Sequence, residues 1–197
     1  ESKADYNIIF IIGPPGSGKN TLSDSLVKKF NLITFGAGDL LREEIKSGSE
    51  NGKYIASIIS QGNIVPVSIT VSLVKAKMDK LGKENVFLID GYPRNKDNID
   101  GWNKLFDGSE GLKAKIHCLI NLECSEEICE KRLLNRGLTS GRLDDDKEVI
   151  KKRFNTHKNE STIVVDLMKE TCQILSINAE LSPDEVIKEA ISKIEES

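Results

Sequence analysis

One stretch near the start of the chain decides the fold, Asn7-Ile8-Ile9-Phe10-Ile11-Ile12-Gly13-Pro14-Pro15-Gly16-Ser17-Gly18-Lys19-Asn20-Thr21. An apolar run of strand length leads directly into a glycine-rich turn, and Leu22, Leu26 and Val27 then follow at helical spacing. Glycines let backbone N–H groups wrap a phosphate, the helix N-terminus adds positive potential, and Lys19 supplies a mobile charge. The stretch therefore predicts a phosphate-binding loop (P-loop), with a plain glycine-rich turn as the alternative.

This loop departs from the usual pattern G-x-x-x-x-G-K-[ST] at one position. Asn20 follows Lys19, and the hydroxyl comes one residue later, at Thr21. The departure narrows the set of P-loop proteins that the chain can resemble.

Apolar, β-prone runs recur along the chain, with longer helix-patterned stretches between them. The runs are Asn7–Ile12, Leu32–Phe35, Val86–Asp90, Ile116–Leu122 and Gln173–Ile177. Alternation of this kind predicts an α/β fold with three layers, a five-stranded parallel sheet carrying helices on both faces. One helix is expected between Pro66 and Gly82, and another after Ser182-Pro183-Asp184-Glu185, which combines an N-cap serine with Pro at N1 and Glu at N3.

Two polar segments do not follow the strand–helix rhythm. The first, 36–65, is helical in pattern with Gly48, Gly52 and Gly62 as breakers, and the second, 135–145, is hinged by Gly137 and Gly141. We expect both to lie over the carboxyl edge of the sheet and to be the parts that move. The chain is then one domain over residues 1–197, with a core of 1–35, 66–134 and 146–197.

The overall composition excludes several classes of function. The 28 Lys+Arg and 31 Asp+Glu residues give a net charge of −3, which leaves no bulk basic surface for nucleic acid or anionic lipid. No apolar run approaches the roughly 18 residues of a membrane span. The four cysteines form no C-x-x-C pair, which favours a reducing compartment, the cytoplasm and also the nucleus. The chain begins at Glu1 rather than Met, so the sequence leaves open whether a leader segment has been removed.

Arginine is used sparingly, at six positions among the 28 basic residues. These are Arg42, Arg94, Arg132, Arg136, Arg142 and Arg153. Two of them lie in the polar segments, one follows the third predicted strand, and Arg132 and Arg136 share a helix face. Planar guanidinium forks suit recognition of several phosphate oxygens, whereas lysine serves a solvated surface equally well. We expect the arginines to converge on one cleft, and scattered surface arginines are the alternative.

A carboxylate, Asp90, ends the third predicted strand, where a P-loop protein places such a group near Mg²⁺. A strand-end aspartate that caps a turn is the competing interpretation. Neither histidine is expected to be catalytic, because His117 fits a core or sheet-face position and His157 lies on a polar helical stretch. Without an obvious general base the acceptor is expected to be a phosphate, although Asp39 could serve as a base or simply cap a helix.

Taken together, these motifs resemble the nucleoside monophosphate kinases, the adenylate kinase-like family that moves the γ-phosphoryl group of ATP to a nucleoside monophosphate. The similarity covers nearly the whole chain. It is carried by 13–21, by Ala37-Gly38-Asp39-Leu40-Leu41-Arg42, by 62–66, by Asp90-Gly91-Tyr92-Pro93-Arg94 and by 136–145. The resemblance implies an acceptor-binding segment at 36–65, a short lid at 135–145, and Mg²⁺ bound with the ATP.

The resemblance also implies roles residue by residue. ATP would be bound by Gly13, Gly16, Ser17, Gly18, Lys19, Asn20, Thr21, Arg136 and Leu181. The monophosphate would be bound by Ala37, Arg42, Asn63, Ile64, Val65, Gly91, Tyr92, Pro93, Arg94, Asn98, Arg142 and Arg153. The transferring group would be stabilised by Lys19, Arg94, Arg132, Arg136, Arg142 and Arg153, and Asp90 would face the magnesium ion through water.

Within that family the stretch 93–104 is more similar to the UMP-CMP kinases than to the adenylate kinases, which carry Gln in place of Asn98 and Thr in place of Ala37. A carboxamide that rotates by half a turn could pair with either uracil or cytosine. Trp102 either lines the same pocket or simply packs in the core. The resemblance thus implies UMP, CMP and also dCMP as acceptors. An adenylate kinase with an unusual pocket and a P-loop module without turnover are the alternatives, and a monomer is expected.

Overall fold

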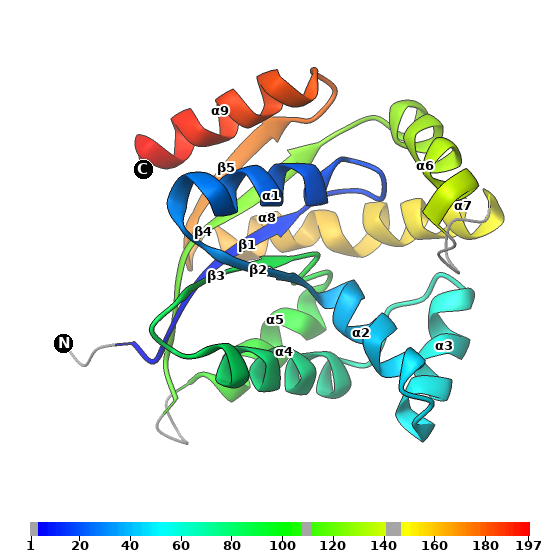
Figure 1. Cartoon of the computed structure of the whole chain (residues 1–197), viewed down its shortest axis with the longest axis horizontal. Coiled ribbons are helices and arrows are strands. Elements are labelled where there is room, and N and C mark those ends of the chain that lie inside the picture. The colour runs from blue at the N-terminus through cyan, green and yellow to red at the C-terminus, as the bar shows by residue number, and fades with distance from the viewer. Residues whose placement is uncertain (1–3, 108–111, 141–146) are drawn as a thin grey trace.

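The computed structural model describes residues 4–107, 112–140 and 147–197, and for 137–140 the backbone only. Five strands pair in parallel in the order β2-β3-β1-β4-β5 (Figure 1). They are β1 (Tyr6–Ile12), β2 (Ile33–Gly36), β3 (Val86–Asp90), β4 (Ala114–Glu123) and β5 (Gln173–Asn178). The predicted sheet is confirmed, with strand ends that differ from the expected ones by at most two residues.

Helices cover both faces of the sheet, as predicted. One face packs against α1 (Lys19–Phe30) and α9 (Pro183–Glu195), and the other against α4 (Val67–Leu81), α5 (Lys96–Leu105) and α8 (Thr162–Met168). Along β1, Ile9 and Ile11 belong to the first layer, whereas Ile8 and Phe10 belong to the second. Burial on both sides explains why β1 and β3 are nearly continuous apolar runs rather than alternating ones.

The capping box predicted at the start of α9 is also confirmed. The Ser182 hydroxyl accepts a hydrogen bond from the Glu185 backbone N–H at 3.3 Å, and the Glu185 carboxylate accepts one from the Ser182 N–H at 3.0 Å. Two backbone donors of the first turn are therefore satisfied, which typically stabilises a helix by about 1 kcal/mol.

The remaining helices lie together beyond one end of the sheet, on the right in Figure 1. They are α2 (Ala37–Lys46), α3 (Glu50–Ser60), α6 (Glu126–Ser140), α7 (Lys147–Thr156) and the π-helical turn η1 (His157–Ser161). A small apolar cluster of Leu41, Ile55 and Val65 holds α2 and α3 together. Because β1 lies between β3 and β4, the strand order reverses there, and ligands of open α/β sheets bind in the crevice at such a point.

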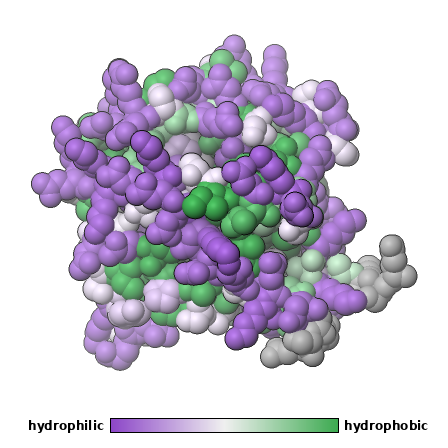
Figure 2. Space-filling view, turned by 180° about the vertical axis from the view of Figure 1, so that it is seen from behind, coloured by the Kyte–Doolittle hydropathy of each residue, from purple (hydrophilic) through white to green (hydrophobic). Residues whose placement is uncertain are grey.

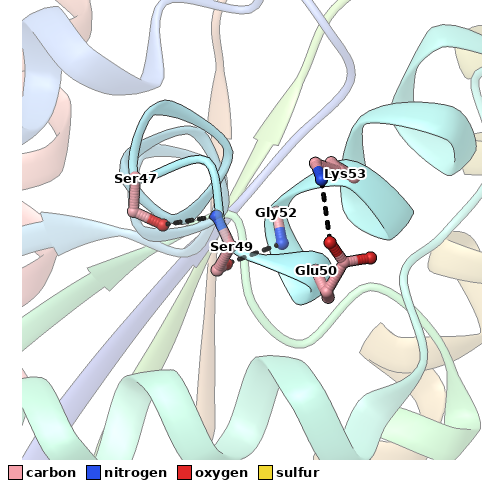
Figure 3. Close-up of polar contacts among 5 residues, drawn as sticks. All are labelled: Ser47, Ser49, Glu50, Gly52 and Lys53. Carbon is pink, nitrogen blue, oxygen red and sulfur yellow. Dashed lines mark hydrogen bonds and ion pairs between the residues drawn. The ribbon is translucent and has the colours of Figure 1, made fainter.

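The junction between α2 and α3 corrects one sequence-based expectation (Figure 3). Gly48 and Gly62 have φ angles of 71° and 73° and follow the two helices, as expected of breakers. Gly52 instead lies inside α3, where its N–H donates to the Ser49 hydroxyl at 2.9 Å. A Cβ at this position would lie 2.3 Å from the carbonyl oxygen of Glu44, so this glycine permits close helix contact rather than breaking a helix.

The segment 135–145, expected to be hinged by Gly137 and Gly141, is in part helical. Helix α6 continues through Gly137 to Ser140, so Gly137 does not end the helix. A single glycine inside a helix costs about 1 kcal/mol relative to alanine, which does not suffice to end a helix that its flanking residues support. The rest of the predicted segment, with Gly141 and Arg142, lies outside the described residues.

In the described part of the chain, no helix is long and apolar enough to span a membrane. Viewed from behind, hydrophilic residues cover most of the molecule and separate smaller hydrophobic areas (Figure 2).

Candidate functional site

The predicted P-loop connects β1 to α1, and steric constraints explain why glycine occupies two of its positions. Gly16 and Gly18 have φ angles of 82° and 89°, which side chains rarely adopt. A Cβ on Gly16 would in addition lie 2.6 Å from the carbonyl oxygen of Cys129 in α6. The loop therefore lies directly against α6, and only glycine fits at its point of closest approach.

The Lys19 side chain folds back over this loop. Its ammonium group donates to the carbonyl oxygens of Gly13 and Pro14 at 3.1 and 3.3 Å. Burial lowers the pKa of Lys19 to about 8, Asp90 opposes that shift, and Arg153 and Arg94 add to it. Because Arg153 and Arg94 repel the positive charge of Lys19, an anion bound in the space beside these residues would be stabilised.

Two adjacent cavities open around Lys19. The first lies between the P-loop, the loop after β3, α7 and the α2–α4 region, and the second runs from the P-loop toward α6. Four cationic residues line both cavities, namely Lys19, Arg42, Arg94 and Arg153. Two compartments thus meet at one group of positive charges.

The structure brings together all five of the arginines that it describes. Arg132 and Arg136 line the second cavity only, and the other three line both. Arg132 Nη1 also donates to the carbonyl oxygen of Ala179 at 2.9 Å, which joins α6 to the loop after β5. Arg94 Nε donates to the carbonyl oxygen of Gly91 at 2.9 Å. The sixth, Arg142, lies outside the described residues.

Asp39 does not cap a helix, contrary to the simpler of its two expected roles. Gly36 occupies the N-cap position of α2, and Asp39 lies within the first turn. Its carboxylate accepts a hydrogen bond from Arg42 Nη2 at 2.5 Å. The position of Asp39 just before Leu40 suggested an N-cap. Helix α2 instead begins directly after β2, so its N-cap lies three residues earlier than expected.

The geometry of Asn98 corrects the half-turn expected of its carboxamide. The residue is buried, and its Oδ1 accepts a hydrogen bond from the backbone N–H of Arg94 at 2.9 Å. Rotation would set the amide NH₂ against that N–H, donor against donor, so the orientation is fixed. The acceptor of the amide is therefore already used within the protein.

Several predicted site residues line neither cavity. Ala37, Val65, Tyr92, Asn98 and Ser17 are buried in the walls behind them, and Leu181 is an exposed residue of the loop before α9. By contrast, Gly13, Asn63, Ile64 and Pro93 line the first cavity, Gly16, Gly18, Asn20 and Thr21 line the second, and Gly91 lines both. Trp102 packs in the core with its ring 5.0 Å from that of Phe10, as its packing interpretation predicted.

The two histidines lie in different environments. His117 is an exposed residue of β4, which agrees with the sheet-face position and not with the core position among its two expected ones, and its Nε2 lies 3.0 Å from Asn7 Oδ1. His157 lines the first cavity, which sequence analysis missed because its neighbours Lys158 and Asn159 are polar and exposed. The one available signal was its spacing of four residues from Arg153, which places both on one helix face.

Oxygen ligands of the kind that Mg²⁺ prefers are present in the second cavity. Asp90 and Thr21 both line it, and Asp90 is close enough to influence the pKa of Lys19. The described residues contain no group of three or more histidine, cysteine or acidic side chains that could hold a metal by themselves. This donor set fits a cation that keeps most of its water and binds together with phosphates.

A parallel sheet with a P-loop after its central strand defines the class of P-loop nucleotide-binding proteins. More narrowly, the chain belongs to the adenylate kinase family, whose model, described as adenylate kinase, matches residues 11–173. The chain is 41% identical to the UMP-CMP kinase of Homo sapiens over 189 residues, 93% of this chain and 94% of that protein. It is 40% identical to UMP-CMP kinase 2 of Caenorhabditis elegans over 190 residues, 96% of each chain. It is 38% identical to the UMP-CMP kinase of Danio rerio over 193 residues, 95% and 96% of the two chains.

Proposed function

We propose that the chain transfers the γ-phosphoryl group of Mg-ATP to a pyrimidine nucleoside monophosphate, UMP, CMP or dCMP, to give ADP and the nucleoside diphosphate. The observation that carries this proposal is the pair of cavities that share Lys19, Arg42, Arg94 and Arg153. Transfer between two phosphates needs a donor and an acceptor site that meet at a cluster of positive charge. The names of the relatives support the choice of acceptor.

The second cavity is the proposed ATP site. The P-loop backbone and Lys19 would hold the β- and γ-phosphates, and Arg132 and Arg136 would face them from α6. Leu181 would offer its backbone to the adenine from the loop before α9. Asp90 and Thr21 would hold Mg²⁺ on the phosphates, Asp90 through water, and the bound ion would neutralise charge on the β and γ oxygens.

The first cavity is the proposed acceptor site. Arg42 and Arg94 would bind the monophosphate, with Asn63 and Ile64 beside it and the NH₂ group of Asn98 directed at the base. Arg153, which lines both cavities, would bridge the donor and acceptor phosphates. Positioning and charge neutralisation would then perform the catalysis, because a phosphate acceptor is already ionised and needs no general base.

We further propose that 36–65 is the acceptor-binding segment and 135–145 the lid, within one domain. Closure of both would exclude water, because an open site would hydrolyse ATP instead of transferring its phosphoryl group. Arg142 would enter the site from the lid. We propose a monomer. The free thiols support a reducing compartment, the cytoplasm and also the nucleus.

The test is a coupled assay of ADP formation from Mg-ATP with UMP, CMP, dCMP, dTMP, AMP and GMP run in parallel. We expect strong turnover with UMP and CMP and little with AMP. Preference for AMP would replace the pyrimidine acceptor with the adenylate kinase alternative. Saturable ATP binding without turnover on any acceptor would instead indicate a non-catalytic module.

A further inference from the structure

His157 is a titratable group in the proposed acceptor cavity that the mechanism above does not use. It opens the π-helical turn η1 and lines the first cavity together with Lys19, Arg94 and Arg153. Turns of this type are rare and occur often at functional sites.

The residues that flank His157 hold it in place. Four residues further on, the Ser161 hydroxyl donates a hydrogen bond to the backbone carbonyl of Arg94. On the other side, the Thr156 hydroxyl lies 3.5 Å from the carbonyl oxygen of Gly62, at the end of the acceptor-binding segment. The backbone on both sides of His157 is thus anchored, to the loop after β3 and to that segment.

His157 lines two cavities that contain titratable and charged groups. In the first cavity they are the cations Lys19, Arg42, Arg94 and Arg153. The other, a groove, presents Glu123, Glu126, Lys158 and Asp166 and the thiol of Cys124. On its own turn, Glu160 accepts a hydrogen bond from the Asn95 amide at 3.1 Å.

Positive charge dominates on the cavity side. Burial, together with Lys19 and Arg94, lowers the pKa of His157 to about 4, so the imidazole is neutral in the empty cavity at pH 7. A phosphate dianion in the same cavity would offset part of this positive charge and so favour the imidazolium.

We propose that His157 is an acceptor-site residue that takes up a proton when the phosphate of the nucleoside monophosphate enters the cavity. The proton comes from solvent, binds the free ring nitrogen, and returns to solvent when the product leaves. The imidazolium then adds a positive charge to the acceptor site only while the site is filled. This inference rests on the proposed function, because the acceptor supplies the dianion.

The chain offers a direct measurement, because it contains only two histidines. The full chain with isotope-labelled histidine would be titrated by NMR, alone and saturated with UMP. The variant His117→Gln assigns the two signals, and the exposed His117 serves as the matched control. We expect the His157 midpoint to rise from about 4 in the free protein to about 6 or higher with UMP, and that of His117 to stay unchanged.

A second measurement compares proton uptake on binding of UMP, by calorimetry at pH 6.5 in two buffers of different ionisation enthalpy. The wild-type chain should take up more protons than His157→Gln. Because the nucleotide is the same, ionisation of its own phosphate cancels. The variant should also raise the KM for UMP several-fold at constant KM for ATP, with thermal unfolding as the check that it is folded.

The possible outcomes separate this inference from the proposed function. One outcome overturns the role of His157 and leaves the proposed function standing. In it, UMP binds, the His157 midpoint stays at its value in the free protein, and the wild-type chain takes up no more protons than His157→Gln. If no nucleoside monophosphate binds the wild-type chain, the proposed function fails and this inference fails with it.

Discussion

The side-chain oxygen of Asn98 accepts a hydrogen bond from the backbone N–H of Arg94 at 2.9 Å. The carbonyl of the same arginine accepts one from the Ser161 hydroxyl, and its Nε donates to the carbonyl oxygen of Gly91 at 2.9 Å. The residue proposed to meet the base and the residue proposed to bind the phosphate therefore form one rigid turn. Hydrogen bonds between side chains and the backbone therefore set the distance between the proposed base contact and the proposed phosphate contact.

The variant Asn98→Asp tests the base contact without breaking this turn. The carboxylate still accepts from the Arg94 N–H, but the NH₂ donor becomes an oxygen that repels O4 of uracil and N3 of cytosine. We expect kcat/KM for UMP and CMP to fall about 10- to 100-fold at constant KM for ATP. Asn103→Asp, the same change at an exposed position of α5, is the matched control. Wild-type kinetics for Asn98→Asp would exclude a base contact through the amide.

Arg153 lines both cavities, so its guanidinium fork is expected to act on the transferring group. Arg153→Lys keeps the charge and loses the planar pair of donors, and kcat should fall about 100-fold with little change in the KM for ATP. Lys151→Ala, at an exposed position of the same helix, should leave turnover unchanged.

Arg142→Ala should likewise lower kcat strongly with a modest change in ATP affinity. Near-normal turnover of either arginine variant would remove that arginine from the mechanism.

The lowered pKa of Lys19 predicts how ATP binding depends on pH. Burial lowers the pKa of its ammonium group to about 8 in the free protein, and bound phosphates raise it again. The free protein thus loses a positive charge as the pH rises through 8, and the Kd for Mg-ATP should increase by up to about tenfold per pH unit above it. Lys19→Arg, which stays charged, should show a flat profile between pH 7 and 9. A flat profile for the wild-type chain would contradict the lowered pKa.

Gly52 should be the position of the α2–α3 junction most sensitive to substitution. In Gly52→Ala the new methyl group would lie 2.3 Å from a backbone oxygen, so we expect a loss of about 2–3 kcal/mol in the free energy of unfolding. Gly48→Ala meets no atom within 4 Å and strains only a φ of 71°, which should cost about 1 kcal/mol. Denaturant unfolding of both variants measures the difference, and equal losses would show that the helices move apart easily.

The fold was largely predictable because local signals and burial agree. Buried parallel strands need continuous apolar runs such as Val86–Asp90, and the capping box at Ser182 needs only neighbouring residues. The roles of single glycines were harder to predict, because they depend on how helices pack against each other and on where a helix ends. Gly52 resembles a breaker until Glu44 is placed against it, and Gly137 resembles a hinge although α6 continues through it.

For the site, the sequence by itself determined the P-loop, the strand-end Asp90 and the small set of arginines, because each is a local pattern of residue types with a distinct chemistry. Only the tertiary structure decided which groups meet. It placed Lys19, Arg42, Arg94 and Arg153 on both cavities, fixed the Asn98 amide, and brought His157 beside the P-loop. Burial, electrostatic fields and hydrogen-bond partners depend on distance in space, and segments more than a hundred residues apart in the chain supply them here.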